Sequence, residues 1–87
     1  MTIVTTTESS RRLAALRDEI TRADAVVRRW RARAASVELA LALGEEDTPE
    51  LRARHDHAIW QANGYTNWLA QLRETERKFA ARVERAA

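Results

Sequence analysis

The chain of 87 residues contains no cysteine, two glycines and one proline. The absence of cysteine excludes disulfide bonds and thiolate metal sites, and it fits a reducing compartment. Scarce glycine and proline, with abundant alanine, arginine and glutamate, are typical of long helices. There is no apolar run long enough to span a membrane, and Met1–Thr7 lacks the pattern of a signal peptide. We therefore expect one small all-α domain in the cytoplasm.

Apolar residues recur at intervals of three and four through the first half of the chain. They are Leu13, Leu16, Ile20, Ala23, Val27, Trp30, Ala34, Val37 and Leu41. This spacing fills the a and d positions of four heptads and predicts a helix over residues 9–43. Ser9 and Ser10 are suited to cap its start, because a serine oxygen accepts hydrogen bonds from a first helical turn. Residues 1–8 show no such pattern, and we expect a flexible arm there.

A turn is predicted at residues 44–48, because Gly44 suits the left-handed residue that ends a helix. Thr48 and Pro49 supply a capping oxygen and a favourable first residue for the next helix. A second heptad string follows at Leu51, His55, Ala58, Ala62, Tyr65, Leu69, Leu72, Glu76, Phe79, Val83 and Ala86. It predicts a helix over residues 49–86. Asn63-Gly64 is a turn signal, so a break there that gives three helices is the alternative.

The short turn makes the two predicted helices antiparallel neighbours. When the chain is folded about Glu46, every a position of one helix faces a d position of the other. Trp30 then faces Ala62, and we expect Gly64 to make room for the Trp30 ring. The sequence thus predicts an antiparallel two-helix hairpin with heptad, coiled-coil packing.

Residues 59–72 contain two of the three tryptophans, the only tyrosine and no charged residue. Side chains here that lie outside the seam have no partner within one hairpin, and uncharged aromatic surfaces mark the centres of protein interfaces. The interface residues that we predict are Ile59, Trp60, Asn63, Asn67, Trp68, Gln71, Leu39 and Leu43. We expect two hairpins to form a homodimeric four-helix bundle. A different protein partner, or simple exposure, are the alternatives.

A basic cluster on the first helix supports a second functional hypothesis. Its members are Arg28, Arg29, Arg31 and Arg33, which flank Trp30. Arginines beside an aromatic ring hold phosphates and stack on bases, as in nucleic-acid binding. These arginines fan out over several heptad positions, however, which also fits a solvated face or a contact between hairpins. Residues 11–33 carry eight arginines against three acids, whereas residues 38–56 carry six acids against two arginines.

No metal or cofactor site is expected. His55 and His57 lie two residues apart and face different sides of a helix, whereas a helical zinc pair lies four apart. Glu76 falls on the seam, and we expect it to pair with neighbouring arginines such as Arg17. The sequence shows no nucleophile–base pair, glycine-rich phosphate loop or paired-carboxylate motif, so we do not expect an enzyme.

One segment supports a third hypothesis. Leu16-Arg17-Asp18-Glu19-Ile20-Thr21-Arg22-Ala23-Asp24 resembles the first helix of small all-helical chorismate mutases. The resemblance implies that Arg17 binds a substrate carboxylate. This chain departs from the family at its second active-site arginine, which falls on Ala34 beside Arg33, and at its lysine, which falls on Glu45. The function that we expect is instead a small non-catalytic module for protein interaction or assembly.

Overall fold

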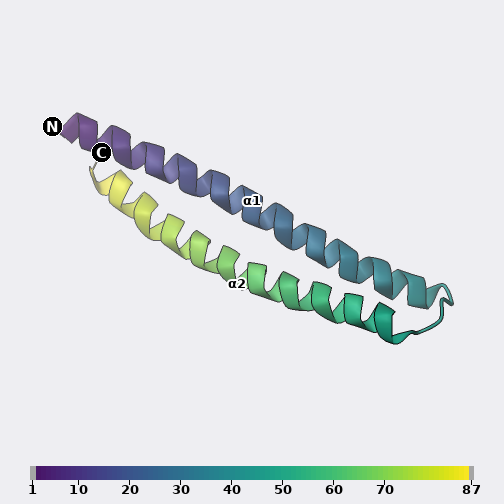
Figure 1. Cartoon of the computed structure of the whole chain (residues 1–87). Coiled ribbons are helices and arrows are strands. Elements are labelled where there is room, and N and C mark those ends of the chain that lie inside the picture. The colour runs from purple at the N-terminus through teal and green to yellow at the C-terminus, as the bar shows by residue number, and fades with distance from the viewer. Residues whose placement is uncertain (1, 87) are drawn as a thin grey trace.

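The protein is a hairpin of two long helices that lie side by side and run in opposite directions (Figure 1). The computed structural model describes residues 2–86, with side chains from residue 7 to 85, so the expectation for residue 1 lies outside it. Helix α1 spans Thr2–Ala42 and helix α2 spans Pro49–Ala86. The molecule is a rod of 65 × 16 × 14 Å. The predicted all-α antiparallel hairpin is confirmed.

The N-terminal part of α1 is the main departure from the predicted boundaries. Residues 2–8 are helical, so α1 begins earlier than the predicted start at residue 9. β-Branched residues cost a helix only about 0.5 kcal/mol each, and extending an existing helix adds one hydrogen bond per residue. Arg12 also bonds the Glu8 carboxylate at 3.2 Å, one turn away. Ser9 and Ser10 therefore lie inside α1 and do not cap it.

Helix α1 ends in a left-handed turn, as predicted. Gly44 has a φ of 94°, a conformation that costs a residue with a side chain about 1–2 kcal/mol. The Glu45 N–H donates to the Ala40 carbonyl at 3.0 Å, and the Gly44 N–H donates to the Leu41 carbonyl at 3.1 Å. These two bonds form a Schellman motif, which satisfies the last carbonyls of the helix and reverses the chain.

The start of α2 is also capped as predicted. The Leu51 N–H donates to the Thr48 hydroxyl oxygen at 3.1 Å, and Pro49 is the first helical residue. Asp47 lies just before the cap, and its two carboxylate oxygens accept hydrogen bonds from the Arg52 guanidinium at 2.8 and 2.5 Å. This hydrogen bonding lowers the pKa of Asp47 from its ordinary value and, with the charge of Arg52, outweighs desolvation.

Helix α2 runs without a break through Asn63-Gly64, so the three-helix alternative was wrong. A glycine inside a helix costs about 1 kcal/mol relative to alanine. Ala62 and Leu69, on either side of the dipeptide, are both buried. Packing on both sides of Gly64 therefore holds α2 in the helical state.

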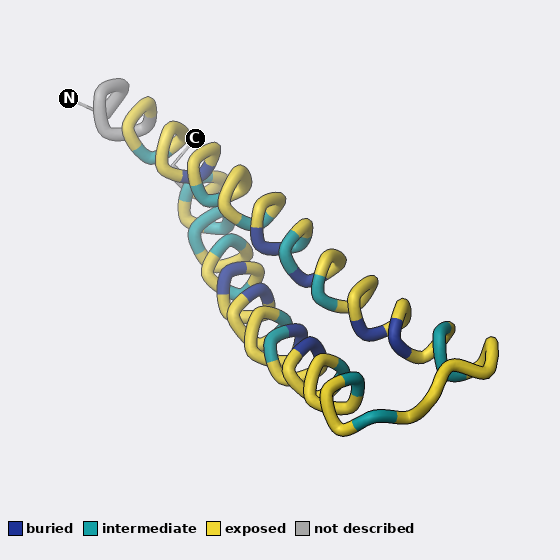
Figure 2. The backbone as a smooth tube through the Cα atoms, turned by 45° about the vertical axis from the view of Figure 1, so that its right-hand side comes forward, coloured by how far each residue is buried: buried dark blue, intermediate teal, exposed yellow. Residues whose placement is uncertain are grey.

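The two helices meet along a single narrow seam (Figure 2). The buried residues are Leu13, Ala23, Val27, Ala34, Val37, Ala58, Ala62, Leu69 and Leu72. All nine occupy predicted heptad positions; the predicted position of Ala86 lies outside the described side chains. Leu16 and Ile20 pack against the cluster of Ala23, Val27, Leu69 and Leu72. The buried face of each helix is therefore the predicted one.

Polar contacts across the hairpin agree with the register that is predicted by folding the chain about Glu46. They include Arg17–Glu76 at 4.0 Å, Arg73–Asp24 at 3.8 Å and His55–Glu38 at 2.8 Å. Arg52 bonds Asp47 beside the turn. Exposed ion pairs contribute at most about 1 kcal/mol each, so the apolar seam supplies most of the stability.

Replacing Gly44 tests the turn. Gly44→Ala should lower the free energy of unfolding by about 1–2 kcal/mol, because alanine is strained at positive φ. Gly44→Asn should cost less, because asparagine adopts the left-handed conformation more readily. Urea denaturation followed by circular dichroism, at one protein concentration, measures both. Equal losses for the two variants would contradict a left-handed requirement at this position.

The Asp47–Arg52 pair predicts a specific acid sensitivity. The pKa of Asp47 is lowered in the folded state, so its contribution is present at neutral pH and is lost as pH falls from its ordinary value of 3.8 through the lowered pKa. In Asp47→Asn, the free energy of unfolding should therefore fall less over that acid range than in the unmodified chain. Unfolding curves at several pH values make the comparison. Parallel pH profiles for the two proteins would rule out the contribution.

Candidate protein interface

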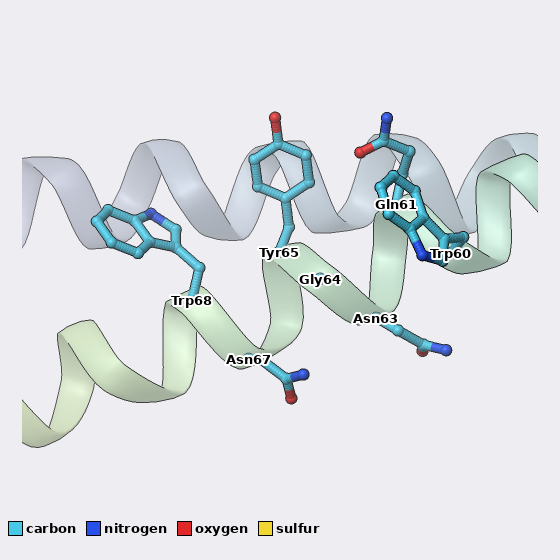
Figure 3. Close-up of a pocket in the computed structure, with 7 residues that line it drawn as sticks. All are labelled: Trp60, Gln61, Asn63, Gly64, Tyr65, Asn67 and Trp68. Carbon is cyan, nitrogen blue, oxygen red and sulfur yellow. The ribbon is translucent and has the colours of Figure 1, made fainter.

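A shallow hollow of about 510 Å³ lies on the outer surface of α2 (Figure 3). Seven side chains or backbone positions line it: Trp60, Gln61, Asn63, Gly64, Tyr65, Asn67 and Trp68. All seven belong to the uncharged stretch at residues 59–72. The hollow therefore combines large aromatic rings with amide groups that donate and accept hydrogen bonds.

Gly64 forms the floor of this hollow. Trp60 and Trp68 lie one helical turn before and after it, so the two indoles rise on either side of a residue without a side chain. A Cβ atom placed on Gly64 would meet no atom within 4 Å. The expectation that Gly64 makes room for Trp30 was therefore wrong. Gly64 instead leaves a notch that is open to solvent.

The aromatic rings at this surface are accessible. The exposed fractions are 71% for Trp60, 44% for Trp68 and 38% for Tyr65. Tyr65 was predicted to lie in the seam, but it is not among the buried residues. The phenol ring instead projects along the edge of the hairpin, where its hydroxyl can reach water (Figure 3).

The structure brings together four of the predicted interface residues: Trp60, Asn63, Asn67 and Trp68. The amides of Asn63 and Asn67 point to the opposite side of the hollow from Gln61 and Tyr65 (Figure 3).

The other predicted residues do not line this hollow. They are Ile59 and Gln71 on α2, with Leu39 and Leu43, which are exposed near the turn. Sequence reasoning missed Gln61 and Gly64 as members of the site, although both lie inside the uncharged stretch. Gly64 was missed because a glycine opposite a predicted inward tryptophan was taken as space for that ring.

A second hollow, of about 420 Å³, lies between the helices and has a different character. It is lined by Trp30, Arg33, Ser36, Val37, Arg54, His57 and Ala58, with no acidic side chain among them. We call it the cationic hollow, because two guanidinium groups line it. Trp30 is half-buried at the edge of the seam rather than fully inside it. The Arg33 guanidinium lies 4.4 Å from the centre of the Trp30 ring, a cation–π distance.

His57 links the two hollows. Its ring meets Trp30 edge-on, with centroids 5.3 Å apart, and stacks on Trp60 at 6.5 Å. A continuous row of three rings therefore runs from the cationic hollow between the helices to the uncharged hollow on α2.

The basic cluster of α1 is dispersed in the structure. Arg28 pairs with Asp24 at 2.9 Å, and Arg31 donates a hydrogen bond to the Thr66 hydroxyl of α2 at 3.3 Å. Arg33 lies over Trp30, and Arg29 is exposed. The four arginines therefore do not form one stripe, and only Arg33 lines the cationic hollow.

Other candidate chemistry is sparse. Arg17 is exposed, faces Glu76 and lines neither hollow. Among the described residues, no group of three or more histidine, aspartate or glutamate side chains is arranged to hold a metal ion. Within the same part of the chain, neither helix has an apolar segment of the length needed to cross a bilayer.

Comparison with known proteins found no relative of this chain. The chain matches no protein-family model, and no curated protein or solved structure is significantly similar to it. The surface chemistry of the hairpin itself is therefore the basis for a functional proposal.

Proposed function

We propose that this protein is a small non-catalytic interaction or assembly module, which self-associates and binds protein through the uncharged hollow of α2. The observation that carries the proposal is the exposure of Trp60 and Trp68 around a notch lined only by uncharged residues. Tryptophan and tyrosine are enriched among the residues that dominate binding energy, and charge is depleted at interface centres.

The accessible surface of the hairpin supports association. A compact monomer of 9.9 kDa exposes roughly 5,200 Å², whereas this chain exposes 6841 Å². The excess is roughly 1,600 Å², about twice what each partner buries in an interface of standard size. A second molecule on α2 would cover part of this excess.

The small core argues in the same direction. Four of the nine buried residues are alanines, and no tryptophan, tyrosine or phenylalanine is among them. A domain of this length has little apolar surface to bury alone, and oligomerisation is one of the ways in which small folds gain stability. Burial of the aromatic rings of α2 would supply the apolar contact that the seam lacks.

Paired tryptophan substitutions test the proposal. Trp60→Ala should leave helicity nearly unchanged but weaken self-association by more than about 1 kcal/mol, because it removes an exposed ring from the interface centre. Trp30→Ala, at the edge of the seam, should instead lower the free energy of unfolding more than Trp60→Ala does. Sedimentation equilibrium and urea denaturation measure the two effects. A monomeric chain at tens of micromolar would overturn self-association.

The cationic hollow favours a second candidate, binding of a nucleic acid. Arg33, Arg54 and His57 converge beside the Trp30 ring without an acidic neighbour in the lining. A phosphate between the two guanidinium groups, with a base stacked on an aromatic face, would use both features.

Gel shifts with random single-stranded DNA or RNA test this candidate. Binding should fall steeply as salt rises. Arg33→Gln and Arg54→Gln should each weaken binding several-fold and reduce its salt dependence, because each removes a phosphate contact that releases counterions. Arg22→Gln, an exposed arginine outside the hollow, is the control of equal charge. Equal losses for Arg22 and Arg33 would indicate non-specific attraction to a basic protein.

A further inference from the structure

The sequence around Gly64 is nearly symmetric about that residue. An amide side chain lies three positions away in each direction, at Gln61 and Asn67, and a tryptophan lies four positions away, at Trp60 and Trp68. In a two-fold dimer, a contact of residue i with residue j is matched by a contact of j with i. A second α2 that runs antiparallel across Gly64 therefore meets the same kind of residue at each level.

The geometry of the notch fits such a copy. Trp60 and Trp68 are separated by about 12 Å along the helix and turn about 40° to opposite sides of Gly64. In an antiparallel pair, Trp60 of one copy thus lies beside Trp68 of the other at the same level, without a collision. Packed helices approach to about 8–10 Å between axes, and Gly64 has open space where a side chain would stand.

Charge selects the antiparallel direction over the parallel one. Residues 38–56, around the turn, carry six acids against two arginines, whereas residues 11–33, toward the open end, carry eight arginines against three acids. A parallel copy would place acidic turn beside acidic turn. An antiparallel copy places the acidic end of each hairpin beside the basic end of the other, which is the complementary arrangement.

We infer that the partner of the α2 hollow is a second copy of this chain, seated antiparallel with the two-fold axis at Gly64 and Trp60 of each copy against Trp68 of the other. This inference rests on the proposed function and specifies its geometry. Gly64 lies near the middle of Pro49–Ala86, so residues 49–79 of the two copies overlap, over about 45 Å of helix.

Single cysteines test the arrangement, because the chain has no other thiol. A spin label on Ala53→Cys should give a distance of about 30–35 Å between copies in the antiparallel dimer, but about 10 Å in a parallel one. Gly64→Cys should form a disulfide-linked dimer on mild oxidation, because facing Cα atoms on the axis lie within disulfide range. Ala32→Cys, exposed on α1, is the control and should stay monomeric in denaturing gels.

A bulky residue in the notch gives an independent readout. Gly64→Leu should raise helicity, because leucine is the better helix former, yet weaken dimerisation at least tenfold, because the side chain separates the two helices. Ala32→Leu, the same kind of enlargement at an exposed position of α1 outside both hollows, should leave the dimer unchanged.

The outcomes distinguish the antiparallel arrangement from the more general proposal that the α2 hollow self-associates. If Trp60→Ala weakens a dimer that Gly64→Leu leaves intact, or if the Ala53→Cys label gives the short distance, the face self-associates but this arrangement is overturned. If the unmodified chain is monomeric, self-association and its geometry are both overturned. The long distance, the link at residue 64 and the loss in Gly64→Leu together establish the arrangement.

Discussion

The structure depends on one constraint: two helices can bury only the face that each turns toward the other. The alanines of the seam, including Ala34 and Ala58, let the helices approach closely, and Leu69 and Leu72 fill the space between them. Such a seam fixes register and direction, but it leaves most of each helix in solvent. Side chains on the outer surface therefore carry information about what the hairpin meets.

Much of the fold was predictable because heptad spacing reports burial directly. Every buried residue stood at a predicted a or d position, and the caps at Gly44 and Thr48 follow from local hydrogen bonding. The errors arose where the helix propensity of the residues is weak, or where the direction of a side chain matters more than its heptad spacing. Residues 2–8 are poor helix formers without a stop signal, so the helix continues through them. A heptad letter also could not show that the Tyr65 ring leaves the seam at its edge.

The sequence predicted which stretch of the chain forms the candidate site, but it did not predict the shape of the site. The absence of charge at residues 59–72 identified the surface, and the structure added its shape, with Gly64 as a floor between two indoles. The direction of each side chain decided which residues converge, and sequence spacing did not give that direction for Trp30, Gln61 or Leu39. The division of labour that emerges is simple: an uncharged centre suits desolvation, while unlike charges near the two ends of the rod suit orientation.

The start of α1 and the end of α2 lie at the same end of the rod, which has a mechanical consequence (Figure 1). A pulling force applied between them would act across the seam rather than along it. The layers would then separate one after another from the open end toward Gly44, like a zipper, so that only one layer bears load at a time. The same seam pulled along its length would load all of its layers together. The hairpin is therefore built to open gradually under tension at its ends, with the capped turn as the last part to yield.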